Sequence, residues 1–317
     1  MRLFWLTRNT VFLASGKIVI PHNVNRKEFN YCGIGQGLRI KVNALIGTAS
    51  NRDDVSTEKR KPAFVEEAGC DALMDLSTGG NVDGMRRFSL EKANIAIGSV
   101  PIYQAAIGAI ENRGSIVAMT AEDMFETIEK QAADGVDFMT FIVLTIWMLS
   151  NGCREAEGLL MWSASCGNND PDAERLCNGA PYFILGTLAT DVAPGYNRIT
   201  SAIGGALACA AGADFLCYVT SAERLGLPTE EDVKERVTAA RIAAHAADLA
   251  RANKEAWEKD RQMARARVAL DIDRQISFFV DPEKTKAARP LVCGMRTGLR
   301  RPGCGQVLWN CFVTGRS

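Results

Sequence analysis

The sequence predicts an α/β fold of the (β/α)8-barrel type, with fewer strand–helix units than a complete barrel has. Short β-branched strands alternate with helical patterns, and the turns between them are short and carry Gly or Asp. About six such units are recognisable before a helical segment follows the last strand. Repeated strand–helix units imply a parallel sheet, wound or closed into a barrel.

The first units occupy residues 38–144. We expect strands at residues 38–46, 72–76, 95–103 and 137–144, and helices at residues 57–68, 82–93 and 121–133. The helix at 121–133 is amphipathic with acidic residues in its first turn, and Gly135 closes it. The run Phe138–Leu149 is strongly apolar but shorter than the about 20 residues of a membrane-spanning helix, so we expect a buried strand that leads into a buried helix.

The pattern is interrupted at residues 150–180, which have no sustained period of either kind. Order returns with a strand at 182–188, a helix at 200–211 and a strand at 215–219. Thr229 and Asp232 resemble a capping box that opens a long helical stretch, expected as two helices ending near residue 270. The predicted domains are an N-terminal extension at 1–17, a shortened barrel at 18–222, a helical region at 223–285 and an atypical tail at 286–317.

Composition excludes several classes of function. Apolar residues make up 47% of the chain, which is enough for a globular core, and 37 basic against 37 acidic residues give no basic excess for nucleic acid. Only two histidines, His22 and His245, are present, so this chain alone cannot build a polyhistidine metal site. The ten cysteines contain no C-x-x-C pair, and the N-terminus matches a signal peptide only weakly. We therefore expect reduced thiols in a cytoplasmic protein with no membrane partner.

Three short segments could bind a ligand or act as plain turns. Ser77–Gly80 lies between a strand and a helix, where barrel proteins bind phosphate or substrate, and both interpretations stay open there. Asp75, just before it, fits either a base or a loop cap. The glycines of Gly33–Gly37 depart from the G-x-G-x-x-G spacing and precede a strand, which favours a plain turn. His245, in an Ala-rich helix, is expected to be structural.

Several long segments together resemble the phosphomethylpyrimidine synthase (ThiC) family, in that family's order. They include GIGQGLRIKVNALIG at 33–47, DALMDLSTGGNVD at 71–83, GSVPIYQA at 98–105 and LGTLATDVAPGYNRITSAIG at 185–204. The resemblance covers most of residues 18–285 and implies a (β/α)8-barrel enzyme of thiamine biosynthesis. That family converts aminoimidazole ribotide to 4-amino-5-hydroxymethyl-2-methylpyrimidine phosphate by radical chemistry. A sister branch makes 5-hydroxybenzimidazole for cobamides.

The resemblance also implies S-adenosylmethionine, a [4Fe–4S] cluster held by a C-terminal Cys-x2-Cys-x4-Cys motif, and a divalent metal beside it. Three thiolates leave one iron open for the amino acid part of the cofactor. This sequence contains no such motif, and the remaining cluster candidates in its tail are Cys293, Cys304 and Cys311. The family's metal-binding histidine before LGLP falls at Arg224, a permanent cation that cannot ligate a metal.

The family's substrate-contact positions are retained in part. Met74 and Tyr103 correspond to two substrate-binding residues of the family and are unchanged. The substrate-binding asparagine of KxNANIG is Leu45 here, which has no donor or acceptor, and the contact tyrosine is Phe183. The histidine of the family's GYDHIT is Arg198.

Three hypotheses follow. The chain could be a working pyrimidine synthase, although the IHAG, SRGG, DGLRPG and EGPGHVP motifs, and with them two barrel strands, are missing. It could be a non-catalytic homologue, either a binding or partner protein or a degraded gene product, because residues 291–317 resemble out-of-frame translation. It could instead descend from the benzimidazole branch. Lost strands would expose sheet edges, which predicts self-association, with a homodimer as the simplest form.

Overall fold

The computed structural model describes residues 9–27, 30–48, 55–140, 178–186, 188–190, 192–193, 195–218 and 230–284. The chain divides into two compact units, residues 1–253 and residues 254–317, and each is described by itself. The domain boundaries expected after residues 17, 222 and 285 stay predictions.

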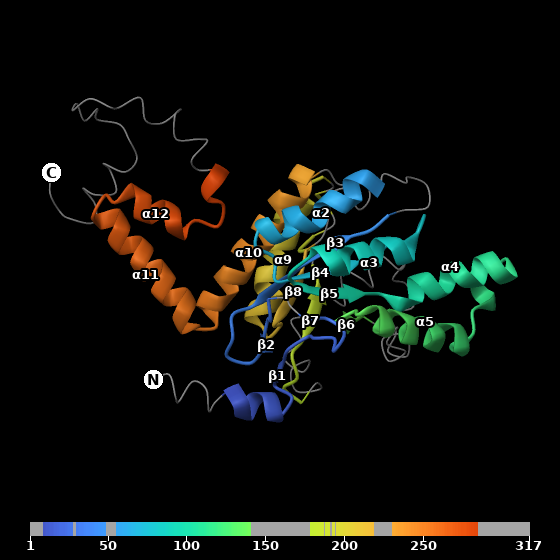
Figure 1. The fold of residues 1–317 in the computed structure, drawn as a ribbon. Coiled ribbons are helices and arrows are strands. Elements are labelled where there is room, and N and C mark those ends of the chain that lie inside the picture. Colours follow the sequence, from blue (N-terminus) through green and yellow to red (C-terminus); the bar gives the residue numbers. More distant parts are fainter. Residues whose placement is uncertain are drawn as a thin grey trace. The chain divides into compact units, whose positions relative to one another are not determined.

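The first unit is built on a parallel sheet, which within the described residues has six strands in the order β6-β5-β4-β3-β8-β7 (Figure 1). These strands are β3 (Lys41–Ile46), β4 (Ala72–Asp75), β5 (Ala96–Ser99), β6 (Phe138–Met139), β7 (Phe183–Leu185) and β8 (Phe215–Cys217). The late strand β8 pairs in parallel with the early strand β3, as the last and first strands of a closed barrel do. The α/β class and the incomplete barrel are therefore confirmed.

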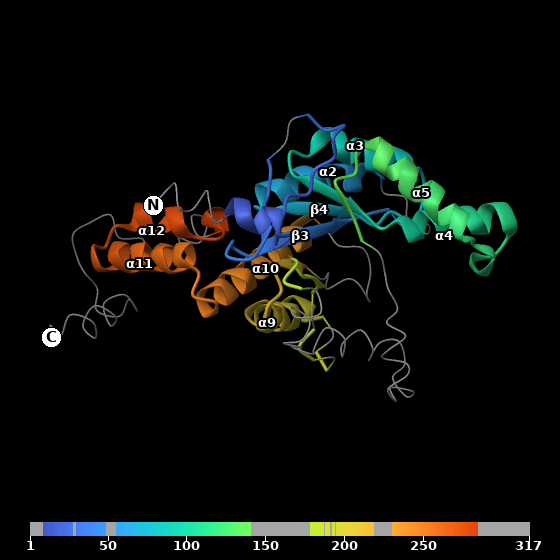
Figure 2. The same cartoon turned by 90° about the horizontal axis from the view of Figure 1, so that it is seen from below.

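Helices follow most of the strands along the chain; some pack on the sheet, whereas the pair at residues 101–134 extends beyond the ends of the strands (Figures 1 and 2). They are α2 (Val55–Glu67), α3 (Val82–Lys92), α4 (Pro101–Arg113), α5 (Ala121–Asp134), α9 (Asn197–Ala210) and α10 (Glu230–Ala250). Helix α9 contacts α10, α10 contacts α2, α2 contacts α3, and α4 contacts α5. Buried aliphatic side chains of alternate strand residues, among them Val42, Leu73, Ile97 and Leu216, fill the core between sheet and helices.

The opposite face of the sheet is concave, and we call it the lumen. The Phe138 ring on β6 lies 5.8 Å from that of Phe215 on β8, although three strands separate β6 from β8 in the sheet. The Phe183 ring on β7 lies 5.1 Å from the same Phe215 ring. These three rings, the aromatic floor, can meet only because the sheet curls. Gly98 on β5 makes room for them, since a Cβ at this position would lie 2.3 Å from Phe138.

One sequence prediction is wrong. The strand expected at 95–103 ends at Ser99, and α4 begins at Pro101. Proline is favoured at the first helical position because its missing N–H has no helical partner there. The helix at 101–113 was not predicted from the sequence. The helix predicted at 121–133 is confirmed as α5, with a capping box at Thr120 and a left-handed Gly135 at its end.

The Gly33–Gly37 segment is a turn, as the sequence indicates. Strands β1 (Ile18–Val19) and β2 (Ile34–Gly35) pair antiparallel there, and Gly35 and Gly37 have φ of 132° and 80°. A Cβ on Gly35 would lie 2.2 Å from the Lys17 carbonyl oxygen, so only glycine fits.

The second unit contains α11 (Lys254–Val268) and α12 (Ile272–Phe278). Asp271 caps α12 by accepting a hydrogen bond from the Arg274 N–H at 3.0 Å, and Gln275 donates to the Ala266 carbonyl at 3.2 Å. The long stretch after Thr229 thus forms separate helices, α10 and α11, as predicted, whereas Thr229 itself lies outside the described residues. None of the helices in the described part of the chain has the length and apolar character needed to cross a membrane.

Candidate functional site

The loops after β3 and β4 are joined at the carboxyl edge of the sheet, where parallel barrels bind their ligands. The Thr48 hydroxyl donates to the Gly79 carbonyl at 2.6 Å, and the Thr78 N–H donates to the Thr48 carbonyl at 2.7 Å. The Ser77 hydroxyl accepts a bond from the Thr48 N–H at 3.2 Å. These bonds hold the Ser77–Gly80 segment in one conformation against the loop that follows β3.

Asp75 adopts the geometry of a loop cap, one of the two roles left open by the sequence. Its Oδ1 accepts hydrogen bonds from the Ser77 N–H at 2.9 Å and the Ser77 hydroxyl at 2.6 Å. Burial raises the pKa of Asp75, although the bonds from Ser77 and the charge of Arg86 lower it in part. A buried carboxyl group with both bonds directed at its own loop stabilises that loop.

Leu45 and Met74 form the layer of the lumen nearest the carboxyl edge. They lie opposite each other on β3 and β4, and Met74 lies opposite Gly98 on β5. Met74 is buried, and its sulfur accepts a hydrogen bond from the Thr140 hydroxyl at 3.8 Å. Two expected site positions, the retained Met74 and the substituted Leu45, are therefore adjacent. This layer is apolar, except for Thr140.

Three other expected positions lie apart from that layer. Tyr103 is half-buried in the first turn of α4, directly after β5. Phe183 belongs to the aromatic floor, where its ring contacts Phe215. Arg198 is on α9 and forms an ion pair with Glu235 of α10.

A polar network between α3, α4 and α5 was not anticipated from the sequence. Arg86, only 1% exposed, donates to Asp83 at 2.6 Å, to Asp134 at 2.6 Å and to Gln104 at 2.8 Å. Gln131 joins the network by donating to Gln104 at 2.8 Å. The only local signal is the i, i+3 spacing of Asp83 and Arg86, because the other partners come from distant helices.

Gln131 also links the network to the sheet, since its Oε1 accepts a bond from the Ser99 hydroxyl at 2.7 Å. Ser99 is the last residue of β5, and Gln104 directly follows Tyr103 on α4. The network therefore fixes the start of α4, and with it Tyr103, against the end of β5.

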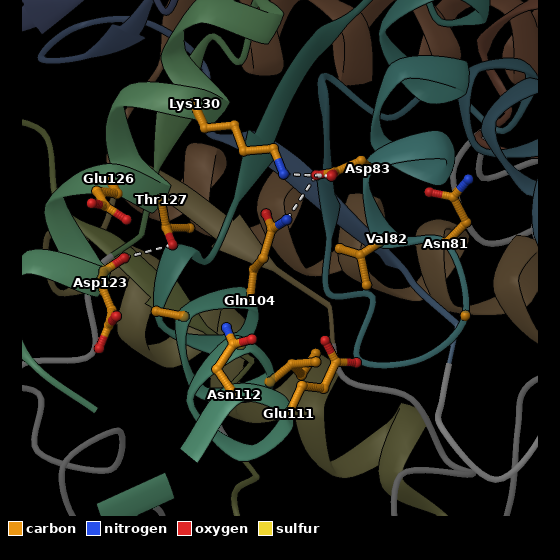
Figure 3. A pocket seen from close by; sticks show the side chains of 14 residues that line it. Asn81, Val82, Asp83, Gln104, Glu111, Asn112, Asp123, Glu126, Thr127 and Lys130 are labelled. Atoms are coloured by element: carbon orange, nitrogen blue, oxygen red, sulfur yellow. Dashed lines mark hydrogen bonds and ion pairs between the residues drawn. The ribbon is translucent and has the colours of Figure 1, made fainter. Parts of the chain in front are cut away.

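A pocket of about 410 Å³ opens beside this network, between the start of α3 and the facing sides of α4 and α5 (Figure 3). Its charged lining consists of Asp83, Glu111, Asp123, Glu126 and Lys130. Burial raises the pKa of Asp83, but hydrogen bonds from Lys130, Gln104 and Arg86 outweigh it and lower the pKa far below its usual range. The pocket therefore has an excess of negative charge at neutral pH.

The described cysteines do not fit an iron–sulfur cluster. Cys32, Cys70, Cys209 and Cys217 are buried and form no disulfide. Burial raises the pKa of Cys32 to about 11 and that of Cys209 to about 12, whereas cluster ligands are thiolates. In the described ranges, His, Cys, Asp and Glu side chains nowhere gather in a group of three that could hold a metal. Cys293, Cys304, Cys311 and Arg224 lie outside these ranges.

Neither histidine is part of the carboxyl edge. His22 Nε2 lies 3.0 Å from the Arg26 carbonyl oxygen. His245 is half-buried on α10, one turn before Asp248. Asp248 accepts a bond from the Ile40 N–H at 3.1 Å, just before β3 begins. His245 therefore lies near the amino edge of the sheet, where the residues of a barrel contribute to stability more than to catalysis.

Known proteins resemble this chain along most of its length. The profile of the Radical SAM ThiC family matches residues 7–151 and 168–297. A 5-hydroxybenzimidazole synthase BzaB of Moorella thermoacetica is 51% identical, over 87% of this chain and 85% of that protein. A phosphomethylpyrimidine synthase of the same organism is 42% identical, over 87% of this chain and 84% of that protein. A BzaB of Eubacterium limosum is 37% identical, over 86% of this chain and 84% of that protein.

The comparisons also show that this chain lacks residues that a relative has. The alignment with the Moorella BzaB spans 363 positions, more than the 317 residues of this chain, so that protein has positions that this chain lacks. The family profile leaves residues 152–167 unmatched, inside the stretch without regular sequence pattern. In the sequence these residues lie between β6 and β7, which are the edge strands of the sheet as far as the chain is described.

Proposed function

Because this chain belongs to the radical SAM ThiC family, we propose that the carboxyl edge of its sheet binds an aminoimidazole ribotide. The observation that carries the proposal is the placement of Met74. It is buried in the lumen near the carboxyl end of β4, opposite Leu45, at a position where the family has a substrate contact. Tyr103, at the start of the helix after β5, is the second proposed contact.

We assign the chain to the benzimidazole branch, with the pyrimidine branch as the alternative. The support is the pair of relatives from Moorella thermoacetica, because both align over the same 87% of this chain and the BzaB is 51% identical against 42%. The substitutions Leu45 and Phe183 agree with a different set of contacts around the ligand, since each lacks a hydrogen-bonding group that the pyrimidine family has at that position.

The proposed role of the described part is binding and orientation. The family's cluster, when bound, supplies an electron that cleaves S-adenosylmethionine, but the described cysteines are buried and form no group of three ligands, so we derive no step through it. Either the tail cysteines provide the cluster, or the chain is a binding or partner protein of the family without catalysis of its own.

Calorimetric titration of the purified chain with aminoimidazole ribotide tests the binding. We expect saturable binding that Met74→Ala weakens about tenfold, because the substitution removes a buried contact surface. Arg87→Ala on the exposed side of α3 is the control and should bind as the original chain does. Absence of saturable binding in the original chain would contradict the proposal.

Iron and sulfide analysis of the purified chain after anaerobic reconstitution tests whether the chain can hold the cluster that catalysis requires. About four irons per chain, with the absorbance of a cluster, would mean that Cys293, Cys304 and Cys311 assemble a site. Incubation with S-adenosylmethionine, a reductant and aminoimidazole ribotide then identifies the branch. 5-Hydroxybenzimidazole supports the assignment, and the pyrimidine phosphate refutes it. A chain that binds no iron is a binding or partner protein.

The remaining proposals concern the assembly and the compartment. We propose a homodimer through β6 and β7, the edge strands of the sheet within the described residues, which sedimentation analysis would detect as twice the mass of 34.4 kDa. A cytoplasmic location agrees with the absence of a disulfide among Cys32, Cys70, Cys209 and Cys217.

A further inference from the structure

A buried carbonyl group on β3 lacks a hydrogen-bond partner. Asn43 is completely buried, and its amide group donates to the Cys217 sulfur on β8 at 3.2 Å. No donor in the described part of the chain reaches Asn43 Oδ1. A buried acceptor of this kind is costly, whereas an apolar side chain of the same size would avoid the cost. An unused acceptor in a core therefore calls for a functional explanation.

Asn43 belongs to the lumen. Side chains of alternate residues on a strand point to the same face, so Asn43 shares a face with Leu45. Asn43 lies opposite Ala72 on β4, and Ala72 belongs to a buried apolar cluster with Phe215. The Asn43 carboxamide thus lies between the Leu45–Met74 layer and the aromatic floor.

The Lys41 ammonium group has three N–H bonds, but none of them reaches Asn43 Oδ1. Lys41, two residues before Asn43 on the same face, donates its ammonium group to the Arg39 carbonyl at 2.9 Å. The rest of the neighbourhood is apolar: Ala72, Leu45 and Met74 have no N–H or O–H group in their side chains. The described side chains around Asn43 Oδ1 thus supply no hydrogen bond to it, and a bound molecule that carries an N–H group would supply one.

We propose that Asn43 Oδ1 accepts a hydrogen bond from the exocyclic amino group of an aminoimidazole bound in the lumen. The proposal rests on the proposed function and adds the residue that recognises the amino group. The family's binding asparagine is Leu45 here, and Asn43 supplies an amide one layer deeper on the same strand face. The apolar side chains of Leu45 and Met74 then contact the ring. The ligand class is a flat heteroaromatic ring with an N–H donor on its edge.

The test compares two ligands on two proteins by calorimetry. The ligands are aminoimidazole ribotide and imidazole ribotide, which differ only in the amino group. We expect the original chain to bind the amino compound about tenfold more tightly, and Asn43→Leu to bind both with the same affinity. Cys217→Ala is the matched control, since it removes the neighbour of Asn43 but keeps Oδ1, and it should preserve the preference.

The outcomes separate the inference from the proposed function. If the original chain binds neither ligand, both fail. If it binds the two ligands equally, or if Asn43→Leu keeps the preference, the inference alone is overturned. The comparison of the two ligands on the original chain needs no variant, so it decides the question even if Asn43→Leu does not fold.

Discussion

The expected contact positions lie on two halves of the sheet that differ in their hydrogen-bonding groups. On the side of β4 and β5, the expected contacts Met74 and Tyr103 are retained, and Arg86 and Gln104 hold the helices behind them. On the side of β3 and β7, the corresponding positions carry Leu45 and Phe183, which offer no hydrogen bond. The half with β4 and β5 thus keeps its expected contacts and the polar network that positions them, whereas the expected positions on β3 and β7 are apolar.

This difference indicates which part of the candidate site also contributes to the stability of the fold. The polar network on the side of β4 and β5 is buried and joins three helices to a strand, so losing one member leaves the others unsatisfied. Leu45 and Phe183 pack against apolar neighbours, where replacing a polar side chain by an apolar one is cheap. The retained half is thus the half that stability also requires.

The largest loss of stability is expected from Arg86→Leu, which removes the centre of the polar network that fixes Tyr103. The variant leaves Asp83, Asp134 and Gln104 without their shared partner, and the free energy of unfolding should fall by about 3–5 kcal/mol in urea titrations. The control Arg87→Ala should cost at most about 1 kcal/mol, because Arg87 is 63% exposed and contacts only Asp134 among the ion pairs described. Equal losses in the two variants would refute the argument.

Gly98→Ala should lower the free energy of unfolding by about 1–3 kcal/mol, because the new Cβ would overlap the Phe138 ring. Gly108→Ala on α4 is the matched control: its Cβ meets nothing within 4 Å, and the substitution should stabilise the helix by about 0.5–1 kcal/mol. Thermal unfolding of both variants checks the opposite signs. A neutral Gly98→Ala would mean that the rings do not meet above Gly98.

The pH dependence of stability should change with Asp75→Asn. The pKa of Asp75 is raised in the folded protein, so the original chain loses stability as the pH rises from the unfolded pKa, about 4, through the folded pKa. Asparagine can still accept from Ser77 and does not ionise. The variant should therefore gain stability relative to the original chain as the pH rises from 4 to 7, as urea titrations at several pH values would measure. A constant difference would contradict this.

The smallest effect is expected from Leu45→Asn, which restores a polar group on the apolar side. Affinity for aminoimidazole ribotide should rise about fivefold, the value of one modest hydrogen bond. Leu45→Ala removes the same side chain without adding an amide and should not raise the affinity. If both variants bind alike, position 45 does not contact the ligand.

Much of the fold could be predicted from the sequence, because local patterns specify the elements. The acidic first turn and Gly135 define α5, and the alternation of strands and helices indicates a parallel sheet. The start of α4 was missed because IAIGSVPIY continues the β-branched pattern through Pro101, and only the helical turn after it shows that the strand has ended. The substrate positions came from the resemblance to a family, since Met74 and Tyr103 have no chemical signature of their own.

The sequence alone determined the family, the shortening and the loss of the Cys-x2-Cys-x4-Cys motif, since each is a matter of residue order. The tertiary structure decided which side chains meet. It placed Asp75 as a loop cap, joined Arg86 to Gln104 and Asp134, and left Asn43 Oδ1 without a partner. Such contacts join residues far apart in the chain, so their distances depend on how the strands and helices pack, which a local pattern does not encode.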